Sequence, residues 1–292
     1  MKDIIPHVTG RVAILSDLHC DSYARAGRDP VGAHGLDSII DGSLDAVIIA
    51  GDLTNGPPRR WGRALALLTR YVAPGKIYLL PGNHDYYNGA LTDDPLLEAQ
   101  ARSAGAHFIQ KSQLYHGDTR FLCCTLWTDF DLLGDAGEAM RVAQRVMNDY
   151  EKIWKSSFAP CSEEVELGWG SVARLIDPTD ILALHQDHRA WLTESLNDPH
   201  RFDEGGRTVI VTHHGPHEAV AGPLDSLTPA FHSDMSDMIE RFNPNAWFFG
   251  HSHRRLRATV GGTDIRNVSV GYPDEVGRQE AGDLFDACLW ES

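Results

Sequence analysis

The sequence contains little that is typical of membrane or exported proteins. Over 292 residues, no apolar run approaches the roughly 18 residues that a membrane-spanning helix needs. The opening stretch MKDIIPHVTGRVAILSD has no basic start, long apolar centre or small-residue cleavage site, which together mark a signal peptide. We therefore expect a chain that is neither exported nor partnered with a membrane.

Cysteine is also scarce, and its pattern does not suit a disulfide framework. The sequence has no CxxC motif and an odd number of cysteines, namely Cys20, Cys123, Cys124, Cys161 and Cys288. Disulfide-stapled domains usually carry an even number of cysteines at regular spacing. This pattern favours a reduced, cytoplasmic setting.

Basic residues are few relative to acidic ones. The chain has 26 Lys and Arg against 41 Asp and Glu, which gives a net charge of −15. A surface this negative repels polyanions, so we expect no long nucleic acid as the main ligand. A small anionic substrate remains compatible with this charge if the site itself is strongly positive. The 15 histidines are a high count, and their placement carries the functional signal.

Five apolar runs each end in a cluster of polar side chains. Each run reads as a short strand buried on both faces, because aliphatic or aromatic residues continue without alternation up to a Gly, Pro or polar residue. The five stretches are VAILSDLH with Asp17 and His19, DAVIIAGDLTN with Asp52 and Asn55, IYLLPGNHD with Asn83, His84 and Asp85, TVIVTHHG with His213 and His214, and AWFFGHSH with His251 and His253.

Helical patterns lie between these runs. Residues 61–72 carry apolar side chains at the three- and four-residue spacing of one helix face, and residues 181–196 predict another helix. In DDPLLEAQARSAG we expect Asp94 as the N-cap and Pro95 as the first helical residue, and in SDMSDMIERF we expect Ser233 as the cap. The alternation of strands and helices predicts a layered α/β core.

Two segments depart from this alternation and read as β-hairpins. QLYHGDTRFLCCTLW turns at Gly117 and Asp118, and RLRATVGGTDIRNVSVG turns at Gly261 and Gly262. In the first of them, Cys123 and Cys124 would point to opposite faces of the strand, so we expect no chemistry from that pair.

A polar, helical stretch interrupts the pattern at about 128–180. Six residues share a face there: Val142, Ala143, Val146, Tyr150, Ile153 and Trp154. No linker rich in Pro, Gly or Ser bounds the stretch. We therefore interpret it as a cap-like insertion within a single domain of residues 1–292, near the site.

The polar clusters at the strand ends predict a metal site. In open α/β sheets, ligand sites form beyond the carboxyl ends of the strands, so residues distant in sequence converge there. Two carboxylates, one amide and four imidazoles suit two metal ions that share a bridging carboxylate. Mixed nitrogen and oxygen ligands favour Mn, Fe, Zn or Co. The expected ligands are Asp17, His19, Asp52, Asn83, His213, His251 and His253.

The order DLH, GDLTN, GNHD, HH, GHSH resembles the calcineurin-like metallophosphoesterase superfamily, and the five motifs span residues 17–253. The resemblance implies a four-layer αββα sandwich of two mixed sheets flanked by helices. It also implies one metal ion on Asp17, His19 and His253, and a second on Asn83, His213 and His251, with Asp52 bridging. His84 would then be catalytic without being a ligand, and Asp85 would orient its imidazole.

The resemblance implies metal-dependent hydrolysis of a phosphoester, with a hydroxide held between the ions attacking phosphorus and His84 assisting the leaving group. The GNHD element and the HH pair look like the bacterial class that includes cyclic-nucleotide diesterases, which favours a small-molecule phosphodiesterase. A phosphomonoesterase on a small or protein substrate and a metal-dependent nuclease are the alternatives. A non-catalytic binding module would have lost ligands, whereas this chain keeps all seven.

Some of these positions also have a simple structural interpretation. Strand alternation allows only one of His213 and His214 to point into the site, and we expect His213. Arg254 and Arg255 could anchor a phosphate oxygen, but a solvated turn is the simpler expectation. Cys20, directly after DLH, is expected to be a small buried filler, not a nucleophile.

Overall fold

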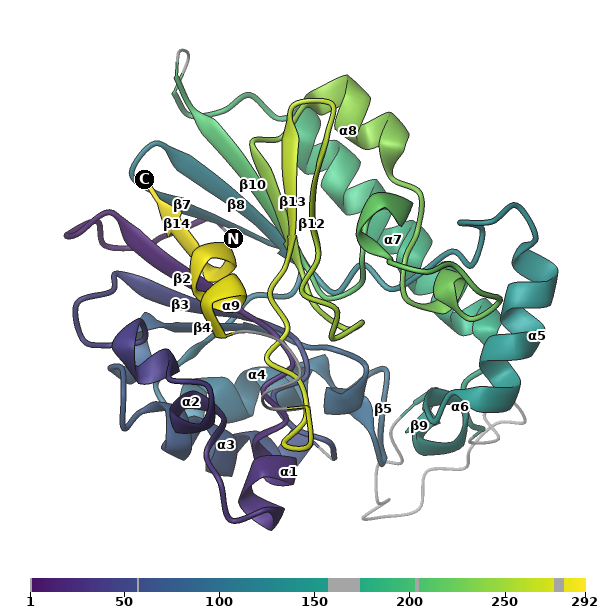
Figure 1. The fold of residues 1–292 in the computed structure, drawn as a ribbon, viewed down its shortest axis with the longest axis horizontal. Coiled ribbons are helices and arrows are strands. Elements are labelled where there is room, and N and C mark those ends of the chain that lie inside the picture. The colour runs from purple at the N-terminus through teal and green to yellow at the C-terminus, as the bar shows by residue number, and fades with distance from the viewer. Residues whose placement is uncertain (1, 57, 157–173, 203–204, 276–280) are drawn as a thin grey trace, which may run out of the picture.

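Two mixed β-sheets lie face to face at the centre of the protein, and helices cover both outer faces (Figure 1). The computed structural model describes residues 2–56, 58–156, 174–202, 205–275 and 281–292. Within these residues the larger sheet has seven strands, in the order β1 (Lys2–Ile4), β7 (Ser112–His116), β8 (Thr119–Cys124), β10 (Arg207–Thr212), β11 (Ala246–Phe249), β13 (Thr263–Asn267) and β12 (Arg257–Val260). The smaller sheet has five, in the order β14 (Leu289–Glu291), β2 (Arg11–Leu15), β3 (Ala46–Ala50), β4 (Ile77–Leu80) and β6 (His107–Phe108). The αββα sandwich expected from the sequence is confirmed.

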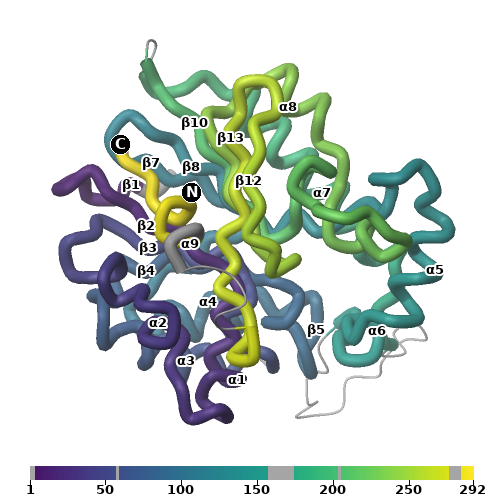
Figure 2. The backbone as a smooth tube through the Cα atoms, in the orientation of Figure 1, coloured from purple at the N-terminus to yellow at the C-terminus, as the bar shows by residue number. Residues whose placement is uncertain are grey.

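Both predicted hairpins are present. β7 pairs antiparallel with β8, and β12 pairs antiparallel with β13, whereas β8, β10, β11 and β13 run parallel to their neighbours in the middle of the sheet. In the smaller sheet β2, β3, β4 and β6 are parallel, and β14 is an antiparallel edge strand. The tube in Figure 2 shows both chain termini at the same side of the sandwich.

Side chains alternate between the two faces of the larger sheet. Phe121 and Cys123 belong to the main core cluster, which includes the strands of the smaller sheet, whereas Leu122 and Cys124 pack on the opposite face. That opposite face is covered by α7 (Pro178–Asn197) and α8 (Ser236–Phe242), through apolar residues such as Leu192. The period of two residues confirms the prediction that Cys123 and Cys124 point in opposite directions.

The outer face of the smaller sheet is covered by the helices that follow its strands (Figure 1). They are α1 (Cys20–Arg25), α2 (Pro30–Ala33), α3 (Trp61–Leu68) and α4 (Asp94–Ser103). The predicted apolar stripe of residues 61–72 is buried as expected. A further helix, α9 (Ala281–Cys288), contacts β2 and β13, one strand of each sheet.

Two predicted helix starts are displaced. Asp94 is the first residue of α4 and not its N-cap, a place that Asp93 takes. Helix α8 begins at Ser236, and Ser233 does not cap it. Instead the Ser233 hydroxyl accepts a hydrogen bond from the Asp129 N–H at 3.2 Å. This tertiary contact uses the oxygen that the sequence pattern predicts as the helix cap.

The stretch predicted as an insertion is partly helical. It contains α5 (Ala136–Val146), the short α6 (Asp149–Lys152) and β9 (Ile153–Trp154), which pairs with β5 (Gly89–Ala90). The predicted common face is divided between elements: Val142 and Ala143 lie in α5, Tyr150 in α6, and Ile153 in β9. All four are buried, but Val146 is 52 % exposed at the end of α5. Residues 157–173, with Cys161, lie outside the described part of the chain.

Two further expectations bear on the class of protein. None of the helices in the described residues is long and apolar enough to cross a membrane. Cys20, Cys123, Cys124 and Cys288 are buried free thiols, and burial raises the pKa of the Cys20 thiol, so that it is not a nucleophile.

Candidate metal centre

The carboxyl ends of five parallel strands meet at one edge of the sandwich and carry the predicted ligands. Asp17 follows β2, Asp52 follows β3, Asn83 follows β4, His213 follows β10 directly, and His251 follows β11. Backbone hydrogen bonds tie the loops together: the Asp17 N–H donates to Gly51 O at 3.0 Å, and the Gly250 N–H donates to His213 O at 3.0 Å. The strand ends therefore converge as the strand-end rule predicts.

The backbone at this edge is unusual. Five of the predicted ligand residues have positive φ angles: Asp17 (58°), His19 (39°), Asp52 (56°), His251 (64°) and His253 (51°). Residues with a Cβ rarely adopt this left-handed conformation, which costs of order 1–3 kcal/mol and is concentrated at functional sites. Here each loop turns sharply after its strand, so that the side chain points back over the sheet edge.

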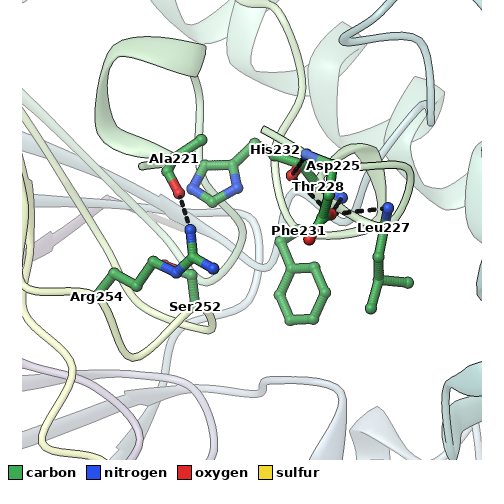
Figure 3. Close-up of a pocket in the computed structure, with 8 residues that line it drawn as sticks. All are labelled: Ala221, Asp225, Leu227, Thr228, Phe231, His232, Ser252 and Arg254. Atoms are coloured by element: carbon green, nitrogen blue, oxygen red, sulfur yellow. Dashed lines mark hydrogen bonds between the residues drawn. The ribbon is translucent and has the colours of Figure 1, made fainter. Parts of the chain in front are cut away.

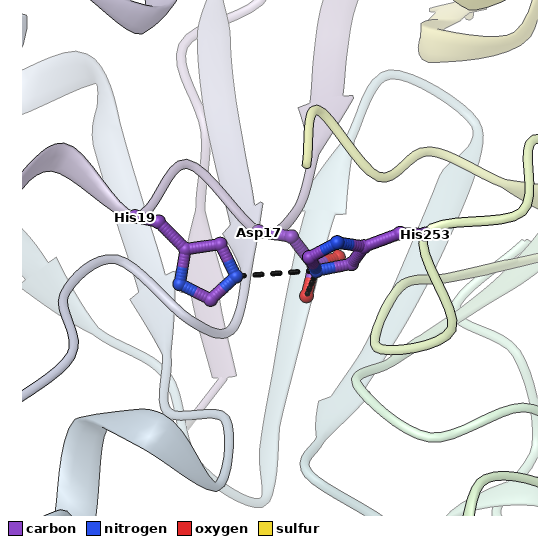
Figure 4. Close-up of side chains that lie close together, drawn as sticks. All are labelled: Asp17, His19 and His253. Carbon is purple, nitrogen blue, oxygen red and sulfur yellow. Dashed lines mark hydrogen bonds and ion pairs between the residues drawn. The ribbon is translucent and has the colours of Figure 1, made fainter. Parts of the chain in front are cut away.

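One group of side chains consists of Asp17, His19 and His253 (Figure 4). Their ligand atoms all lie within 4.8 Å of one another. Nε2 of His253 lies 3.4 Å from Asp17 Oδ1 and 3.2 Å from Nε2 of His19. Asp17 and His19 are fully buried.

A second group consists of Asp52, His213 and His251, again with ligand atoms within 4.8 Å of one another. Asn83 belongs to the same place, because its Oδ1 lies 3.1 Å from Nε2 of His213. His214 is not in this group, and its ring stacks between Trp127 and His251 instead. The structure therefore brings His213 toward the site, as expected of the pair.

The Asp52 carboxylate lies between the two groups. Its Oδ2 is 3.9 Å from Nε2 of His19, in the first group, and its Oδ1 is 3.5 Å from Nε2 of His213, in the second. A carboxylate with one oxygen toward each group is what two ions sharing a bridging ligand require. His84 also lies close, with Nε2 at 3.9 Å from Asp52 Oδ2, and forms a possible third group with His19 and Asp52.

Hydrogen-bond partners outside the ligand groups, called outer partners below, hold these side chains in the orientation that a metal ion needs. Nδ1–H of His213 donates to Ala50 O at 2.9 Å, and Nδ1–H of His253 donates to Glu275 at 2.8 Å. Each bond leaves the lone pair of Nε2 facing the site, which is the usual tautomer of a ligating histidine. Nε2 of His251 is buried without a hydrogen-bond partner in the described chain. The residues therefore fit a metal centre.

Burial and charge set the protonation of the cluster. Burial lowers the pKa of His19 and of His251 well below the ordinary value, so both imidazoles are neutral. Burial acts to lower the pKa of His253, but the hydrogen bonds and charges of Asp17 and Glu275 together outweigh it and raise the pKa to about 9. Burial, and then the charge of Asp17, raises the pKa of Asp52. A bound cation reverses these last two shifts, because it competes with protons for the same lone pairs.

His84 faces the cleft and is held by Asn55. The Asn55 amide donates through Nδ2 to Ser22 Oγ at 2.8 Å, which fixes its Oδ1 toward Nδ1 of His84. Nδ1 therefore carries the hydrogen, and Nε2 points toward the Tyr87 hydroxyl at 3.3 Å. The ring also stacks on Tyr87, with centroids 4.2 Å apart.

Asp85 does not orient His84, contrary to the prediction. Its buried carboxylate accepts hydrogen bonds from four donors: Leu53 N at 3.3 Å, Thr54 N at 3.1 Å, Gly82 N at 2.9 Å and Trp61 Nε1 at 2.7 Å. These donors belong to the loops after β3 and β4 and to helix α3. Asp85 thus fixes the loops that carry Asp52 and Asn83, because backbone N–H groups buried there need an acceptor.

The metal groups line a cleft of about 330 Å³. One wall is formed by Val146, Met147, Asn148 and Asp149, which belong to the stretch predicted as an insertion. Leu227, Phe231, Tyr272 and Glu275 also line the cleft. No lysine or arginine is among the described residues that line this cleft.

The model of one protein family, described as calcineurin-like phosphoesterase, matches residues 10–255. The chain belongs to the calcineurin-like phosphoesterase family. It is 25% identical to an uncharacterised protein of Acanthamoeba polyphaga mimivirus, over 89% of this chain and 91% of that one. Its fold is similar to that of the phosphopantetheinyl hydrolase of Mycobacterium tuberculosis, with a TM-score of 0.67 and 18% identity over 98% of this chain and 97% of that one. This phosphoesterase is therefore a metal-dependent hydrolytic enzyme by family.

Two outer partners of the phosphoesterase centre could not be assigned from sequence. Asp149 accepts a hydrogen bond from Asn83 Nδ2 at 2.8 Å and from the Tyr87 hydroxyl at 2.7 Å. Glu275 accepts from His253, and also from the Tyr272 N–H at 2.7 Å. Asp149 lies 66 residues from Asn83, and Glu275 lies 22 residues from His253, in stretches without a motif. No local signal marks them.

Replacing Asp149 by asparagine is expected to weaken the metal centre. The variant loses a charged acceptor for Asn83 Nδ2, so the Oδ1 that faces His213 is no longer fixed. Loss of such an outer partner costs about 10–100-fold in metal affinity or activity. Calorimetric titration with Mn²⁺ checks this, and Glu151→Gln, an exposed charge change on the same helix, is the matched control. Unchanged affinity in a folded Asp149→Asn protein would contradict the assignment.

Proposed function

We propose that this phosphoesterase hydrolyses phosphodiesters of small molecules with two metal ions. One ion would be held by Asp17, His19 and His253, and the other by Asn83, His213 and His251. The observation that carries the proposal is the position of the Asp52 carboxylate, with one oxygen toward each group. The chemistry of the donors, nitrogen and oxygen without thiolate, favours Mn, Fe, Zn or Co.

When bound, such ions supply Lewis-acid stabilisation of the phosphoryl oxygens and generate a nucleophile from water. The chain itself supplies orientation and a group that can relay a proton. His84 Nδ1–H is held by Asn55, so Nε2 is the nitrogen available to the substrate. Burial lowers the pKa of His84 to about 3, so the imidazole is neutral at rest. It would take up a proton at Nε2 from the attacking water and deliver it to the departing oxygen, which is general-acid catalysis.

The charge of the cleft favours a diester over a monoester. A phosphodiester carries one negative charge, whereas a phosphomonoester carries nearly two at neutral pH. Asp149 and Glu275 line the cleft, and none of its described lining residues is a cation other than the histidines. The metal ions would therefore neutralise a diester more completely than a monoester. The fold of the neighbouring phosphopantetheinyl hydrolase is compatible with a small organic phosphoester as substrate.

Three further expectations belong to the same proposal. The stretch 128–180 would act as an insertion that closes one side of the cleft, within a single domain of residues 1–292. The acidic chain would not bind long nucleic acid, which weighs against a nuclease. Free, buried cysteines in the described chain suit a reducing compartment such as the cytoplasm.

The test is hydrolysis of bis(p-nitrophenyl) phosphate against p-nitrophenyl phosphate. Metal-stripped protein receives Mn, Fe, Zn, Co or Mg in turn, and kcat/KM is measured for both substrates. We expect metal-restored turnover with the diester preferred by about tenfold, which corresponds to about 1.4 kcal/mol in the transition state. A preference for the monoester would overturn the diester assignment. Absence of turnover with every metal would overturn the proposed function itself.

A further inference from the structure

A second cavity adjoins the metal cleft. It has a volume of about 150 Å³, and Figure 3 shows the side chains that line it: Ala221, Asp225, Leu227, Thr228, Phe231, His232, Ser252 and Arg254. Leu227, Phe231 and Ser252 also line the metal cleft. The two cavities are therefore adjacent, and only side chains that line both of them lie between them. Arg254 directly follows the metal-centre residue His253 in the chain.

Arg254 presents free donors to this cavity. Its Nη1 donates to Ala221 O at 2.7 Å and to Pro223 O at 3.4 Å, and no carboxylate pairs with it among the described residues. A Cβ added to Gly222 would lie 2.8 Å from Nη1, so glycine at this position leaves room for the guanidinium. Nε and Nη2 remain available. Arg255, by contrast, is used by the fold, because it donates to Ser269 O and Val270 O.

His232 is the second polar wall of the cavity. It is 1% exposed, and neither ring nitrogen has a hydrogen-bond partner in the described chain. Burial and then the charge of Arg254 lower its pKa to about 4, so one nitrogen carries a hydrogen at neutral pH. A buried imidazole without partners is costly unless a ligand or water satisfies it. Gly215 packs directly against this ring, and a Cβ at that position would lie 2.1 Å from Cδ2 of His232.

The remaining polar groups are compatible with an anion. The Ser252 hydroxyl accepts from Asn267 Nδ2 at 3.1 Å, so its own hydrogen is free to donate. Asp225 is the one carboxylate among the described lining residues. Its Oδ1 accepts hydrogen bonds from Leu227 N and Thr228 N, each at 2.9 Å, and from Thr228 Oγ1 at 3.0 Å. These donors satisfy Oδ1 within its own turn.

We propose that this cavity is a subsite for a second anionic group of the substrate, a carboxylate or phosphate, carried on the alcohol away from the reacting phosphorus. Arg254 would bind that group through Nε and Nη2, with hydrogen bonds from His232 and Ser252. The inference rests on the proposed function, because a substrate group can occupy this cavity only if the substrate's phosphorus binds in the adjacent metal cleft. The subsite would let the enzyme prefer phosphodiesters that carry such a second anionic group. Among the described residues that line it, the metal cleft itself has no arginine or lysine to bind that group.

The kinetic test uses two diesters that differ in one group. Bis(p-nitrophenyl) phosphate is compared with p-carboxyphenyl p-nitrophenyl phosphate, in which a carboxylate replaces one nitro group of similar shape. We expect the native enzyme to prefer the carboxylate, and Arg254→Gln to lower this preference about tenfold, mainly through KM. Arg254→Lys, which keeps the charge, should restore part of it. Arg59→Gln, an exposed change of the same charge, should leave the preference unchanged.

A binding test separates the inference from the proposed function. Metal-stripped native protein is titrated with inorganic phosphate by calorimetry, and the two Arg254 variants are titrated alongside after circular dichroism shows that they are folded. Binding that weakens in Arg254→Gln and recovers in Arg254→Lys supports the subsite, even if no diester is hydrolysed. An unchanged substrate preference in folded Arg254→Gln would overturn it, and so would phosphate binding that does not depend on Arg254.

Discussion

Replacing Asp52 by asparagine is expected to remove bound metal and to abolish turnover of bis(p-nitrophenyl) phosphate. Asp52 is 1% exposed, with one carboxylate oxygen toward each group of ligands. An amide keeps the shape but offers one neutral oxygen, so it cannot bridge two cations. Loss of several kcal/mol of transition-state stabilisation corresponds to a fall in kcat/KM of at least about a thousandfold.

The measurement is metal content by elemental analysis beside kcat/KM, for native protein and for Asp52→Asn. Asp37→Asn is the matched control, because Asp37 is exposed and lies outside the cluster. Its metal content and activity should equal those of the native protein. If Asp52→Asn kept both ions and a tenth of the activity, Asp52 would not bridge, and the two-metal assignment would fall.

The convergence of the ligands within each sheet could be predicted because it depends on strand direction. Parallel strands end at the same edge of a sheet, so a polar cluster after each apolar run becomes one cluster in space. Asp17, Asp52 and Asn83 follow three adjacent strands of the smaller sheet, and His213 and His251 follow two adjacent strands of the larger one. The packing of the two sheets then brings these two sets together, and strand direction does not determine that step.

What could not be predicted depends on contacts between segments distant in sequence. Asp85 neighbours His84 in the chain, yet its carboxylate turns to Trp61 and to the loop N–H groups, and Asn55 holds the imidazole instead. Asp149 reaches Asn83 from α6 in the same way. The direction of a side chain next to a catalytic residue depends on its backbone dihedral angles, and the tertiary structure determines those angles.

The same reason explains the displaced helix starts. A serine or aspartate before an apolar stripe satisfies a helix N-terminus only if no other donor competes for its oxygen. The Ser233 hydroxyl meets the Asp129 N–H from a distant segment, 104 residues away. A helix capped by Ser233 would begin at residue 234, whereas α8 begins two residues later, at Ser236. Periodicity predicted that the helix exists, whereas its end is set by a tertiary contact.

Replacing His84 by glutamine is expected to lower kcat about 10²–10⁴-fold while both metal ions stay bound. The imidazole lies over the cleft with Nδ1–H held by Asn55, and Nε2 faces outward near the Tyr87 hydroxyl. Glutamine has similar length and hydrogen-bonding capacity but cannot transfer a proton. Metal content is therefore the decisive second measurement, because His84 also lies near His19 and Asp52 in a possible ligand group.

Asn55→Ala extends this experiment from the proton donor to the residue that positions it. Without the Asn55 oxygen the imidazole is free to change tautomer, so kcat should fall about tenfold and its dependence on pH should shift, with KM and metal content unchanged. His107→Gln, an exposed histidine on β6, is the control. Loss of one metal ion from His84→Gln would make His84 a ligand. Retention of native kcat would show that another group protonates the departing oxygen.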